Sequence, residues 1–339
     1  MSKKDILIGL LNTDAKRVND KISLSELNGL EITITGATGL IGLNLICALI
    51  YYNKHHAKQP IKINALSYRE PTGIFKDIFK DENIVSITGD IKDMRFIEKI
   101  PLSDCIIHSA GYGQPGKFLD DKLGTIAINT SATINLANRL RENGRFLFLS
   151  SSEVYSGNTT NKNIEGDIGS TDPSHPRACY IEGKRAGEAI INILREKGVK
   201  AASARLALAY GPGIRSGDER VLNQFIQKAL NGKINLLDKG DAMRSYGYIS
   251  DVIIMLLNIL IDNNFAVYNI GGKSVTSIRN LAIIIGEEVG VEVNIPDSEM
   301  HMHDAPQIVG LDLARVENEY GHNDYISFNQ GIKNTIEWI

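Results

Sequence analysis

The chain has 339 residues, a formal net charge of −3 and 43% hydrophobic residues, and its acidic and basic side chains are interspersed. This length predicts one large α/β domain with a smaller lobe or two domains, and the missing basic face excludes a charge-driven nucleic-acid partner. Cys47, Cys105 and Cys179 are widely separated and lack metal-ligand spacing, so we expect reduced thiols in a cytoplasmic protein and no metal site.

Strands and helices alternate through the first two thirds of the chain. Residues 1–28 form an N-terminal extension that is expected to hold a short helix or two. Runs of β-branched and other apolar residues predict strands at 31–35, 61–66, 84–88, 104–109, 145–150 and 201–206. Helical spacing predicts helices at 40–53, 125–143 and 177–197. This alternation predicts an α/β fold with a Rossmann-type, doubly wound parallel sheet.

The C-terminal third has a looser pattern and is expected to form a smaller substrate-binding lobe. We expect a helix from residue 250, a strand at 266–270, a helix at 277–289 and a closing element at 328–339. The apolar run at 252–261 falls short of the roughly 20 residues of a membrane span, so no membrane partner is expected. The predicted dinucleotide-binding domain is 29–211, with 243–270 returning to it, and the lobe comprises 212–242 and 271–339.

A glycine-rich turn lies between the first predicted strand and the helix that follows it. Its glycines have the spacing of a dinucleotide-binding loop, in which they permit a tight turn, a close approach to a pyrophosphate and close helix–strand packing. The anion then lies against amides at the helix N-terminus. A turn without a ligand is the alternative. The candidate cofactor residues here are Gly36, Thr38, Gly39, Leu40, Ile41 and Gly42.

The ends of the second and third strands supply further cofactor candidates. Asp90, beside Ile91, is expected either to accept a hydrogen bond from an adenine amine or to cap a helix. The second strand ends near Ser67 and Arg69, without the acid that usually holds the ribose hydroxyls of NAD. NAD is the expected cofactor, and these two residues leave NADP open.

The fourth strand and the helix after it complete the cofactor candidates. Asn129 is expected to be a polar support residue facing this region, with an ordinary exposed helix position as the alternative. The residues expected to line the nicotinamide ribose are His108, Ser109, Ala110 and Gly111.

Tyr180 and Lys184 are the strongest indication of chemistry in the chain. They are four residues apart, about one helical turn, so both side chains share a helix face. A phenol has an ordinary pKa of about 10 and needs a nearby cation to act as a base near neutral pH. We therefore expect Lys184 to lower the pKa of Tyr180 and to hold the cofactor ribose, as in a hydride-transfer site.

The fifth strand ends in serines that point to the same chemistry. Ser151 is expected to hydrogen-bond a substrate hydroxyl while Tyr180 removes its proton and the hydride passes to the nicotinamide. The alternative is that the serines cap a turn and that Glu153 is a solvated acid.

Three stretches carry a family resemblance: 150–155, 176–185 and 244–251. Through them the chain resembles the extended short-chain dehydrogenase/reductases of the nucleotide-sugar epimerase/dehydratase group, and most of all UDP-glucuronate decarboxylases. The resemblance implies that Ser151 is the catalytic Ser or Thr and that Ser152 and Glu153 act after oxidation. It implies that Arg244 contacts the nucleotide diphosphate or the sugar carboxylate. It also covers a substrate-lobe segment, 217–225, which contains the candidate substrate residue Asn223.

The resemblance implies transient oxidation of a nucleotide sugar at carbon 4, with decarboxylation as the preferred outcome and 4,6-dehydration or 4-epimerisation as alternatives. Ser152 stands where glucose-type dehydratases place an Asp, and serine is a poor general acid. GDP-mannose-type dehydratases also carry the Ser–Glu pair. Two segments depart from the decarboxylases: 112–118 replaces a proline-rich loop, and 211–213 replaces their Gly-Pro-Arg, with the candidate substrate residue Arg215 nearby.

Two proteins of other classes fit the same fold: a non-catalytic dinucleotide-binding sensor and an alcohol dehydrogenase that releases its reduced cofactor. The resemblance also implies a homodimer formed through the helices at 125–143 and 177–197, and it extends to bacterial polysaccharide-cluster enzymes.

Overall fold

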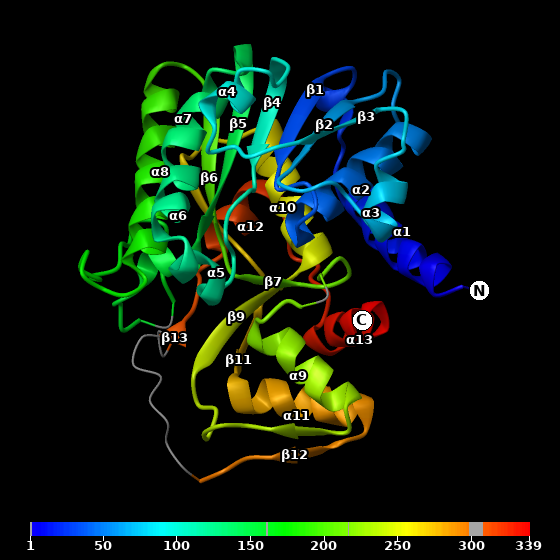
Figure 1. Ribbon diagram of the computed structural model, residues 1–339, viewed down its shortest axis with the longest axis vertical. Coiled ribbons are helices and arrows are strands. Elements are labelled where there is room, and N and C mark those ends of the chain that lie inside the picture. The colour runs from blue at the N-terminus through cyan, green and yellow to red at the C-terminus, as the bar shows by residue number, and fades with distance from the viewer. Residues whose placement is uncertain (1, 161, 216, 298–307) are drawn as a thin grey trace.

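The computed structural model describes residues 2–160, 162–215, 217–297 and 308–339, and places a large α/β layer above a smaller lobe (Figure 1). The large sheet has seven strands in the order β10-β6-β5-β4-β1-β2-β3, all paired in parallel. This confirms the predicted Rossmann-type sheet. Its strands are β1 Glu31–Thr35, β2 Lys62–Ser67, β3 Ile84–Thr88, β4 Ser103–His108, β5 Leu140–Ser151, β6 Lys200–Leu206 and β10 Val267–Ile270.

Helices cover both faces of this sheet, and the side chains of β5 show how the two cores are separated. Leu147 and Leu149 belong to one apolar cluster, and Phe146 and Phe148 belong to the other, as the alternation of side chains along a strand requires. In Figure 1, α6–α8 lie on one side of the sheet and α1–α3 on the other. The helices of this layer are α1 Lys3–Lys21, α2 Leu40–His55, α3 Gly73–Ile78, α4 Met94–Ile97, α5 Pro115–Asp120, α6 Lys122–Asn129, α7 Ser131–Ala137, α8 Ala178–Glu196, α10 Ile249–Ile261 and α12 Ala314–Tyr320.

The single helix predicted at 125–143 is wrong. The structure has two short helices, α6 and α7, and β5 already begins at Leu140. Asn143 has a φ of 61°, which no right-handed helix accepts, and Leu140 pairs with Ser103 in the sheet. The amphipathic pattern of this segment reflects packing on the sheet and not one continuous helix.

The smaller lobe is built around a four-stranded sheet in which β9 Met243–Tyr248 pairs with its three partners. Within the segment 243–270 that was expected to return to the larger domain, β9 belongs to this lobe sheet, and α10 and β10 join the large layer. The remaining elements of the lobe are β7 Leu208–Tyr210, α9 Val221–Leu230, β8 Lys233–Asn235, β11 Ser274–Ser277, α11 Ile278–Val289, β12 Glu292–Asn294, β13 Ile308–Val309 and α13 Phe328–Trp338.

The N-terminal extension, expected to hold a short helix or two, contains one continuous helix, α1, which packs on α2 and α10. Its buried face includes Leu11 and Val18. Arg17 forms an ion pair of 2.7 Å with Asp251 of α10, and Asp14 accepts a hydrogen bond of 3.0 Å from the Tyr248 hydroxyl of β9. The helix therefore stabilises the junction of the two layers. None of the helices in the described ranges is long and apolar enough to cross a membrane.

Asp14 makes the stability of this junction depend on pH. Burial raises the pKa of its carboxyl to about 7, against hydrogen bonds from Tyr248 and Ser250 and the charge of Arg17 that lower it. The folded carboxyl therefore holds a proton that the unfolded chain releases, so the free energy of unfolding falls as pH rises from about 4 to about 7. We expect Asp14→Asn to remove this fall and to raise the midpoint of thermal unfolding at pH 8 by a few degrees, since 1 kcal/mol is worth roughly 2 °C in a chain of this size.

Thermal unfolding followed by circular dichroism between pH 4 and 9 measures this effect. The exposed Asp20→Asn on the same helix is the matched control and should keep the wild-type pH dependence. A parallel pH profile for Asp14→Asn and the wild type would show that Asp14 does not titrate in this range.

Candidate active site

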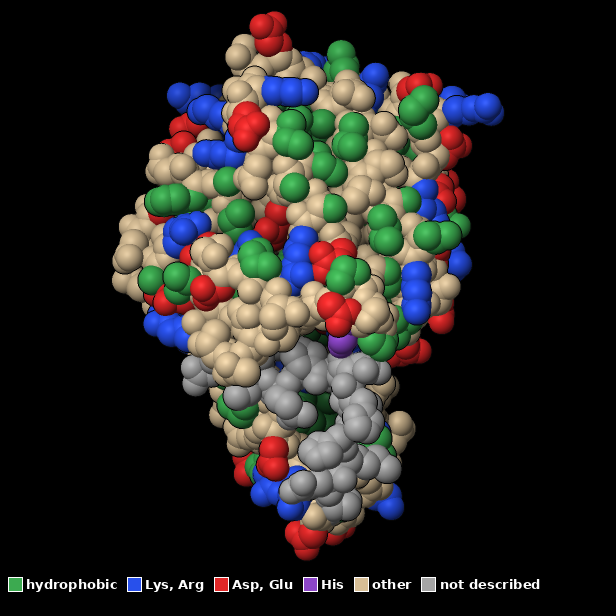
Figure 2. Space-filling view, turned by 90° about the vertical axis from the view of Figure 1, so that its left-hand side faces the viewer, with side chains coloured by type: hydrophobic (Ala, Val, Ile, Leu, Met, Phe, Trp, Pro, Cys, Tyr) green, Lys and Arg blue, Asp and Glu red, His purple; other side chains and the backbone are tan. Residues whose placement is uncertain are grey.

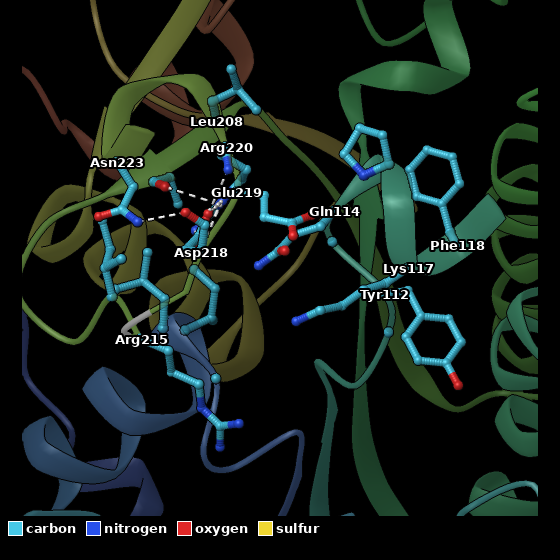
Figure 3. Close-up of a pocket in the computed structure, with 18 of the residues that line it drawn as sticks. Tyr112, Gln114, Lys117, Phe118, Leu208, Arg215, Asp218, Glu219, Arg220 and Asn223 are labelled. Atoms are coloured by element: carbon cyan, nitrogen blue, oxygen red, sulfur yellow. Dashed lines mark hydrogen bonds and ion pairs between the residues drawn. The ribbon is translucent and has the colours of Figure 1, made fainter. Parts of the chain in front are cut away.

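A cleft of about 2230 Å³ runs between the carboxyl ends of the large sheet and the smaller lobe. Parallel α/β sheets bind their ligands at this edge. The cleft is lined by nearly all of the candidate residues, from the glycine loop through the end of β5 to Arg244. Asn129 is absent from its lining. Figure 3 shows the part of the cleft where the lobe segment 215–223 faces α5 and the loop before it.

The glycine loop has a geometry that only glycine permits. Gly36 has a φ of +68°, and a Cβ there would lie 2.9 Å from the Cα of Ala110 at the end of β4. A Cβ on Gly42 would lie 2.4 Å from the carbonyl oxygen of Gly36. Helix α2 starts after Gly39 without a side-chain cap, so its first amides offer an anion site to the cleft. These residues fit the pyrophosphate of a dinucleotide.

The strand ends around the loop are tied together by their side chains. Ser109 donates a hydrogen bond to the carbonyl oxygen of Thr35. The amide of Ala110 donates a hydrogen bond of 3.0 Å to the hydroxyl of Thr35. Ser67 donates a hydrogen bond of 2.9 Å to the carbonyl oxygen of Arg69. Asp90 accepts a hydrogen bond of 2.9 Å from the amide of Lys92. The first two bonds join the ends of β1 and β4, and the last two close local turns at the cleft, which Thr38, Leu40, Ile41, Ile91 and Gly111 also line. The expectation for His108 is wrong: it is 1% exposed, does not line the cleft and bonds to the side chain of Thr35 and the carbonyl oxygen of Ile128.

Asn129 lies under this region and not in the cleft. It is 1% exposed, its amide donates 2.8 Å to the carbonyl oxygen of Thr125, and it packs against Gly183 of α8. The alternative of an ordinary exposed position is therefore wrong.

Tyr180 and Ser151 meet at the centre of the cleft. Helix α8 carries the phenol, and the Ser151 side chain at the end of β5 lies near enough to lower the pKa of that phenol. The ring of Phe118, from α5, stacks on Tyr180 with centroids 4.6 Å apart and an angle of 15° between planes. Sequence reasoning missed Phe118, although it lies in the departing segment 112–118. The phenol is thus held by one polar and one apolar neighbour.

Lys184 lies one turn beyond the phenol on the same face of α8. Its ammonium donates 2.7 Å to the carbonyl oxygen of Leu149 and lies 5.7 Å from the centre of the Tyr180 ring. Burial lowers the pKa of Lys184 to about 7, although the charge of Glu188 opposes this shift. The proposed base, Tyr180, and the cation expected to assist it, Lys184, therefore lie within one turn of helix α8.

Tyr180 does not have the lowered pKa that was expected beside Lys184. Burial raises the pKa of Tyr180 to about 12, and the charge of Glu153 adds to this rise. The hydrogen bond from Ser151 and the charge of Arg177 act in the opposite direction without outweighing burial. A phenolate in this cleft needs further positive charge.

Glu153 is an ion-paired acid and not a solvated one. Arg177 Nε donates 3.0 Å to Glu153 Oε2, and its Nη2 contacts the other carboxylate oxygen. The guanidinium also lies 5.1 Å from the centre of the Phe118 ring. The charges of Glu153 and Arg177 both act on Arg244. Arg177 was missed as a site residue, although it stands three positions before Tyr180, on the same helical face.

The lobe side of the cleft holds the remaining candidates. Arg215 Nε donates 2.7 Å to the carbonyl oxygen of Thr38, so this arginine lies over the glycine loop. The Asn223 amide donates to the carbonyl oxygen of Asp218, and Asp218 pairs with Arg220 at 2.7 Å. In Figure 3 this group faces Gln114 and Lys117 across the cleft, both missed from the sequence. Ser152, 7% exposed, also lines the cleft.

A buried ion pair holds α8 to the end of β5. Glu188 accepts hydrogen bonds of 2.9 and 2.7 Å from Arg205 of β6 and one of 2.5 Å from the Ser150 hydroxyl. Arg205 also donates 2.8 Å to the Tyr155 hydroxyl, which donates 2.7 Å to Asn269 of β10. Both partners of the ion pair are nearly inaccessible to solvent. This network sets the position of residues 151–153 relative to Tyr180 and Lys184.

Comparison with known proteins agrees with this geometry. The model of the NAD dependent epimerase/dehydratase family matches residues 32–271. UDP-glucuronic acid decarboxylase 1 of Xenopus tropicalis is 28% identical over 93% of this chain and 73% of its own length. UDP-glucuronic acid decarboxylase 6 of Arabidopsis thaliana is 27% identical over 90% and 87% of the two chains. The resemblance predicted from the sequence is confirmed.

Solved structures show the same fold. The UDP-glucose 4-epimerase of Thermotoga maritima, with UDP-glucose, has a TM-score of 0.78 at 21% identity, over 91% of this chain and 98% of that one. The dTDP-glucose 4,6-dehydratase of Streptomyces venezuelae, with NAD bound, has a TM-score of 0.77 at 20% identity, over 91% and 96%. The predicted fold class is therefore confirmed by structures as well as by the sheet order.

Gly36 provides a test of the cofactor loop. We expect Gly36→Ala to lower the free energy of unfolding by about 1–3 kcal/mol, because the left-handed backbone and the contact with Ala110 both resist a Cβ. NAD binding should weaken by about ten-fold or more, which requires a loss of only about 1.4 kcal/mol. Urea unfolding and isothermal titration calorimetry measure the two effects. Gly113→Ala is the control, because a Cβ there meets no atom within 4 Å; equal effects of both substitutions would contradict this interpretation of the loop.

Proposed function

The chain belongs to the NAD-dependent epimerase/dehydratase family, and from that premise we propose that it oxidises a UDP-glucuronate-like nucleotide sugar at carbon 4 and then decarboxylates it. NAD is the cofactor of the family. The proposal for the reaction is supported by relatives named as UDP-glucuronic acid decarboxylases that align with about nine-tenths of the chain. The observation that carries it is the cluster of Tyr180, Ser151, Glu153, Arg177 and Arg244 in one cleft.

The oxidation step uses the phenol and its neighbours. The glycine loop from Gly36 to Gly42 would hold NAD, which when bound would supply the acceptor for the hydride of carbon 4 and the positive charge of its oxidised ring. Ser151, beside Tyr180 in the cleft, orients the sugar hydroxyl through a hydrogen bond to it. Tyr180 takes the hydroxyl proton as the carbon–hydrogen bond breaks. Lys184 supplies its ammonium charge below a pKa of about 7 and holds the end of β5 through Leu149. The product of this step is a 4-keto sugar.

The decarboxylation step uses the cations at the other side of the phenol. A 4-ketouronate is a β-keto acid, so breaking the bond between carbon 5 and the carboxylate releases carbon dioxide and leaves an enolate at oxygen 4. Arg177 and Arg244 place two guanidinium groups beside Glu153 in this part of the cleft, and guanidinium groups suit a substrate carboxylate. Tyr180, now protonated, stabilises the enolate oxygen, and a proton from water replaces the lost carboxylate at carbon 5. Return of the hydride to carbon 4 and of the Tyr180 proton to oxygen 4 then gives the UDP-pentose and leaves no net reduced cofactor.

The alternatives within the family differ in what they need from these residues. A 4,6-dehydratase protonates a departing hydroxide, and Ser152 is a poor acid for that step where glucose-type dehydratases have an Asp. GDP-mannose-type dehydratases share the Ser–Glu pair, so Ser152 argues only against the glucose type. A 4-epimerase needs no acid and no carboxylate-binding cation beside the phenol. The pair Arg177–Glu153 therefore favours the decarboxylase.

The homodimer is also a proposal. The helices α6, α7 and α8 expose a set of large apolar side chains on the side of the molecule that Figure 2 views. Leu123 is 82% exposed, and a monomer gains nothing from such exposure. We infer that a second copy covers these side chains. They are Leu123, Ile126, Ile134 and Ile193.

Light scattering after size exclusion tests the dimer. We expect Leu123→Asp to convert the wild-type dimer to a monomer, because a buried unpaired carboxylate opposes association. Leu102→Asp, at a position exposed by 45% outside these helices, should remain a dimer. A monomeric wild type at micromolar concentration would overturn the proposal.

Incubation with UDP-glucuronate tests the reaction. We expect release of carbon dioxide and a UDP-pentose, resolved by mass spectrometry. Loss of water from UDP-glucose or dTDP-glucose would indicate a dehydratase instead, and an isomer of unchanged mass would indicate an epimerase. Net accumulation of reduced cofactor would indicate a plain dehydrogenase. Bound NAD without turnover of any of these sugars would favour the non-catalytic sensor.

Tyr180→Phe should lower the rate of UDP-glucuronate turnover by about 100-fold or more, because the proton acceptor is lost. NAD affinity should change little, so a binding measurement separates chemistry from folding. The matched control is Tyr112→Phe, which removes a cleft phenol bonded to Asp121 and should retain most of the rate. Equal rates for Tyr180→Phe and the wild type would eliminate the proposed proton transfer.

A further inference from the structure

Phe118 is the one buried residue of α5, a helix that otherwise borders the open cleft. Its side chain is 1% exposed, whereas the preceding residue, Lys117, is exposed. In Figure 3 the Lys117 side chain extends toward the lobe residues, and the Phe118 ring points away from them. The ring is therefore directed at the interior of the large layer, where the proposed base lies.

The Phe118 ring contacts two groups of the proposed site at once. It stacks on the ring of Tyr180, with centroids 4.6 Å apart and 15° between the planes, which is within the range of an offset stack. The guanidinium carbon of Arg177 lies 5.1 Å from the centre of the same ring, at cation–π distance. Arg177 in turn holds Glu153 in an ion pair. One side chain thus adjoins both the proton acceptor and the ion pair beside it.

The backbone around Phe118 fixes where its ring lies. The carbonyl oxygen of Phe118 accepts a hydrogen bond of 3.3 Å from the Thr125 hydroxyl of α6. It also accepts a contact of 3.5 Å from the thiol of Cys179, the residue before Tyr180 on α8. The Phe118 amide donates 3.2 Å to the carbonyl oxygen of Gln114. These bonds use no side-chain atom of Phe118, so a substitution there changes the ring and leaves them available.

The charged groups that face the Tyr180 phenol come from elements other than α5. Lys184 and Arg177 belong to α8 and its start, Glu153 follows β5, and Arg220 comes from the lobe. Helix α5 adds an uncharged ring to these surroundings. The phenol has intermediate exposure and borders the cleft, so Phe118 covers a face that water would otherwise reach. Excluding water from that face disfavours the charged phenolate.

We propose that Phe118 is a positioning residue, which holds the Tyr180 phenol and the Arg177 guanidinium in fixed orientations and keeps water from the covered face of the phenol. This role rests on the proposed function, because it assumes that Tyr180 is the proton acceptor. A misplacement of about 1 Å between reacting groups can cost a factor of about 100 in rate, so the orientation of the phenol matters even though Phe118 touches no reacting atom.

Turnover of UDP-glucuronate, or of whichever tested sugar the wild type accepts, measures this role with NAD saturating. We expect Phe118→Leu to lower kcat by about ten-fold and to change KM by less than about two-fold, because the phenol loses its orientation. Phe118→Ala should also move the acidic limb of the kcat–pH profile to lower pH by about half a pH unit or more, since water then stabilises the phenolate. Phe118→Leu retains an apolar cover and should keep the wild-type limb.

Two controls separate positioning from a loss of stability. Phe79→Leu, at a buried position that does not line the cleft, should keep the wild-type kcat, KM and pH profile. Introduced into Tyr180→Phe, Phe118→Leu should change the remaining rate by less than about two-fold, because two residues that act as one unit are not additive. Circular dichroism and NAD titration show whether each variant is folded. If Phe118→Ala does not fold, the Phe118→Leu variant and the double variant decide.

The outcomes separate this role from the reaction itself. An active wild type with an unchanged kcat in Phe118→Leu would overturn the positioning role and leave the proposed function standing. A rise in KM alone, or a full ten-fold further loss in the Tyr180→Phe background, would also overturn it, because the ring would then act independently of the phenol. A wild type that turns over no sugar would refute the proposed function, and the positioning role with it.

Discussion

The buried ion pair between Glu188 and Arg205 is the interaction on which the proposed site depends. The serines and the acid stand on β5, whereas the phenol and the lysine stand on α8, and the contact of Glu188 with Ser150 joins the two. Removing one partner of such a buried pair typically costs about 3–5 kcal/mol, because the other charge stays buried without compensation. The pair also extends through Tyr155 to β10, so one network orders the sheet edge and the chemistry above it.

Much of the fold could be predicted because its signals are local. Strand β1 and strand β3 have the predicted limits, since β-branched residues bounded by turns define them within a few positions. The glycine loop was found for the same reason, because a left-handed Gly36 and a close approach at Gly42 are demands of the backbone itself. By contrast, the break between α6 and α7, the early start of β5 and the lobe strand β9 depend on pairing with distant strands. No local pattern specifies such pairing.

The site shows the same division. Tyr180, Lys184 and Ser151 could be named from spacing, but their electrostatics could not, because burial decides the pKa of both the phenol and the amine. Arg177 was overlooked since its partner Glu153 is 24 positions away in the chain. Arg215 was assigned to the substrate, and its contact with Thr38 instead directs it to the cofactor loop. Residue types and spacing therefore indicate the chemistry of the site, whereas burial and neighbouring side chains, which depend on the fold, determine the charge of each group.

Because Phe118 stacks on Tyr180, one short helix both borders the open cleft and packs against the proposed catalytic phenol. Helix α5 presents Lys117 to the open cleft and, at the next position, presses an aromatic ring on the phenol. Replacing this segment with the loop of a relative, in order to change which sugar is accepted, would therefore also change the packing against the Tyr180 phenol. An engineer who wished to alter selectivity alone would randomise Gln114 and Lys117 while leaving the adjoining ring in place.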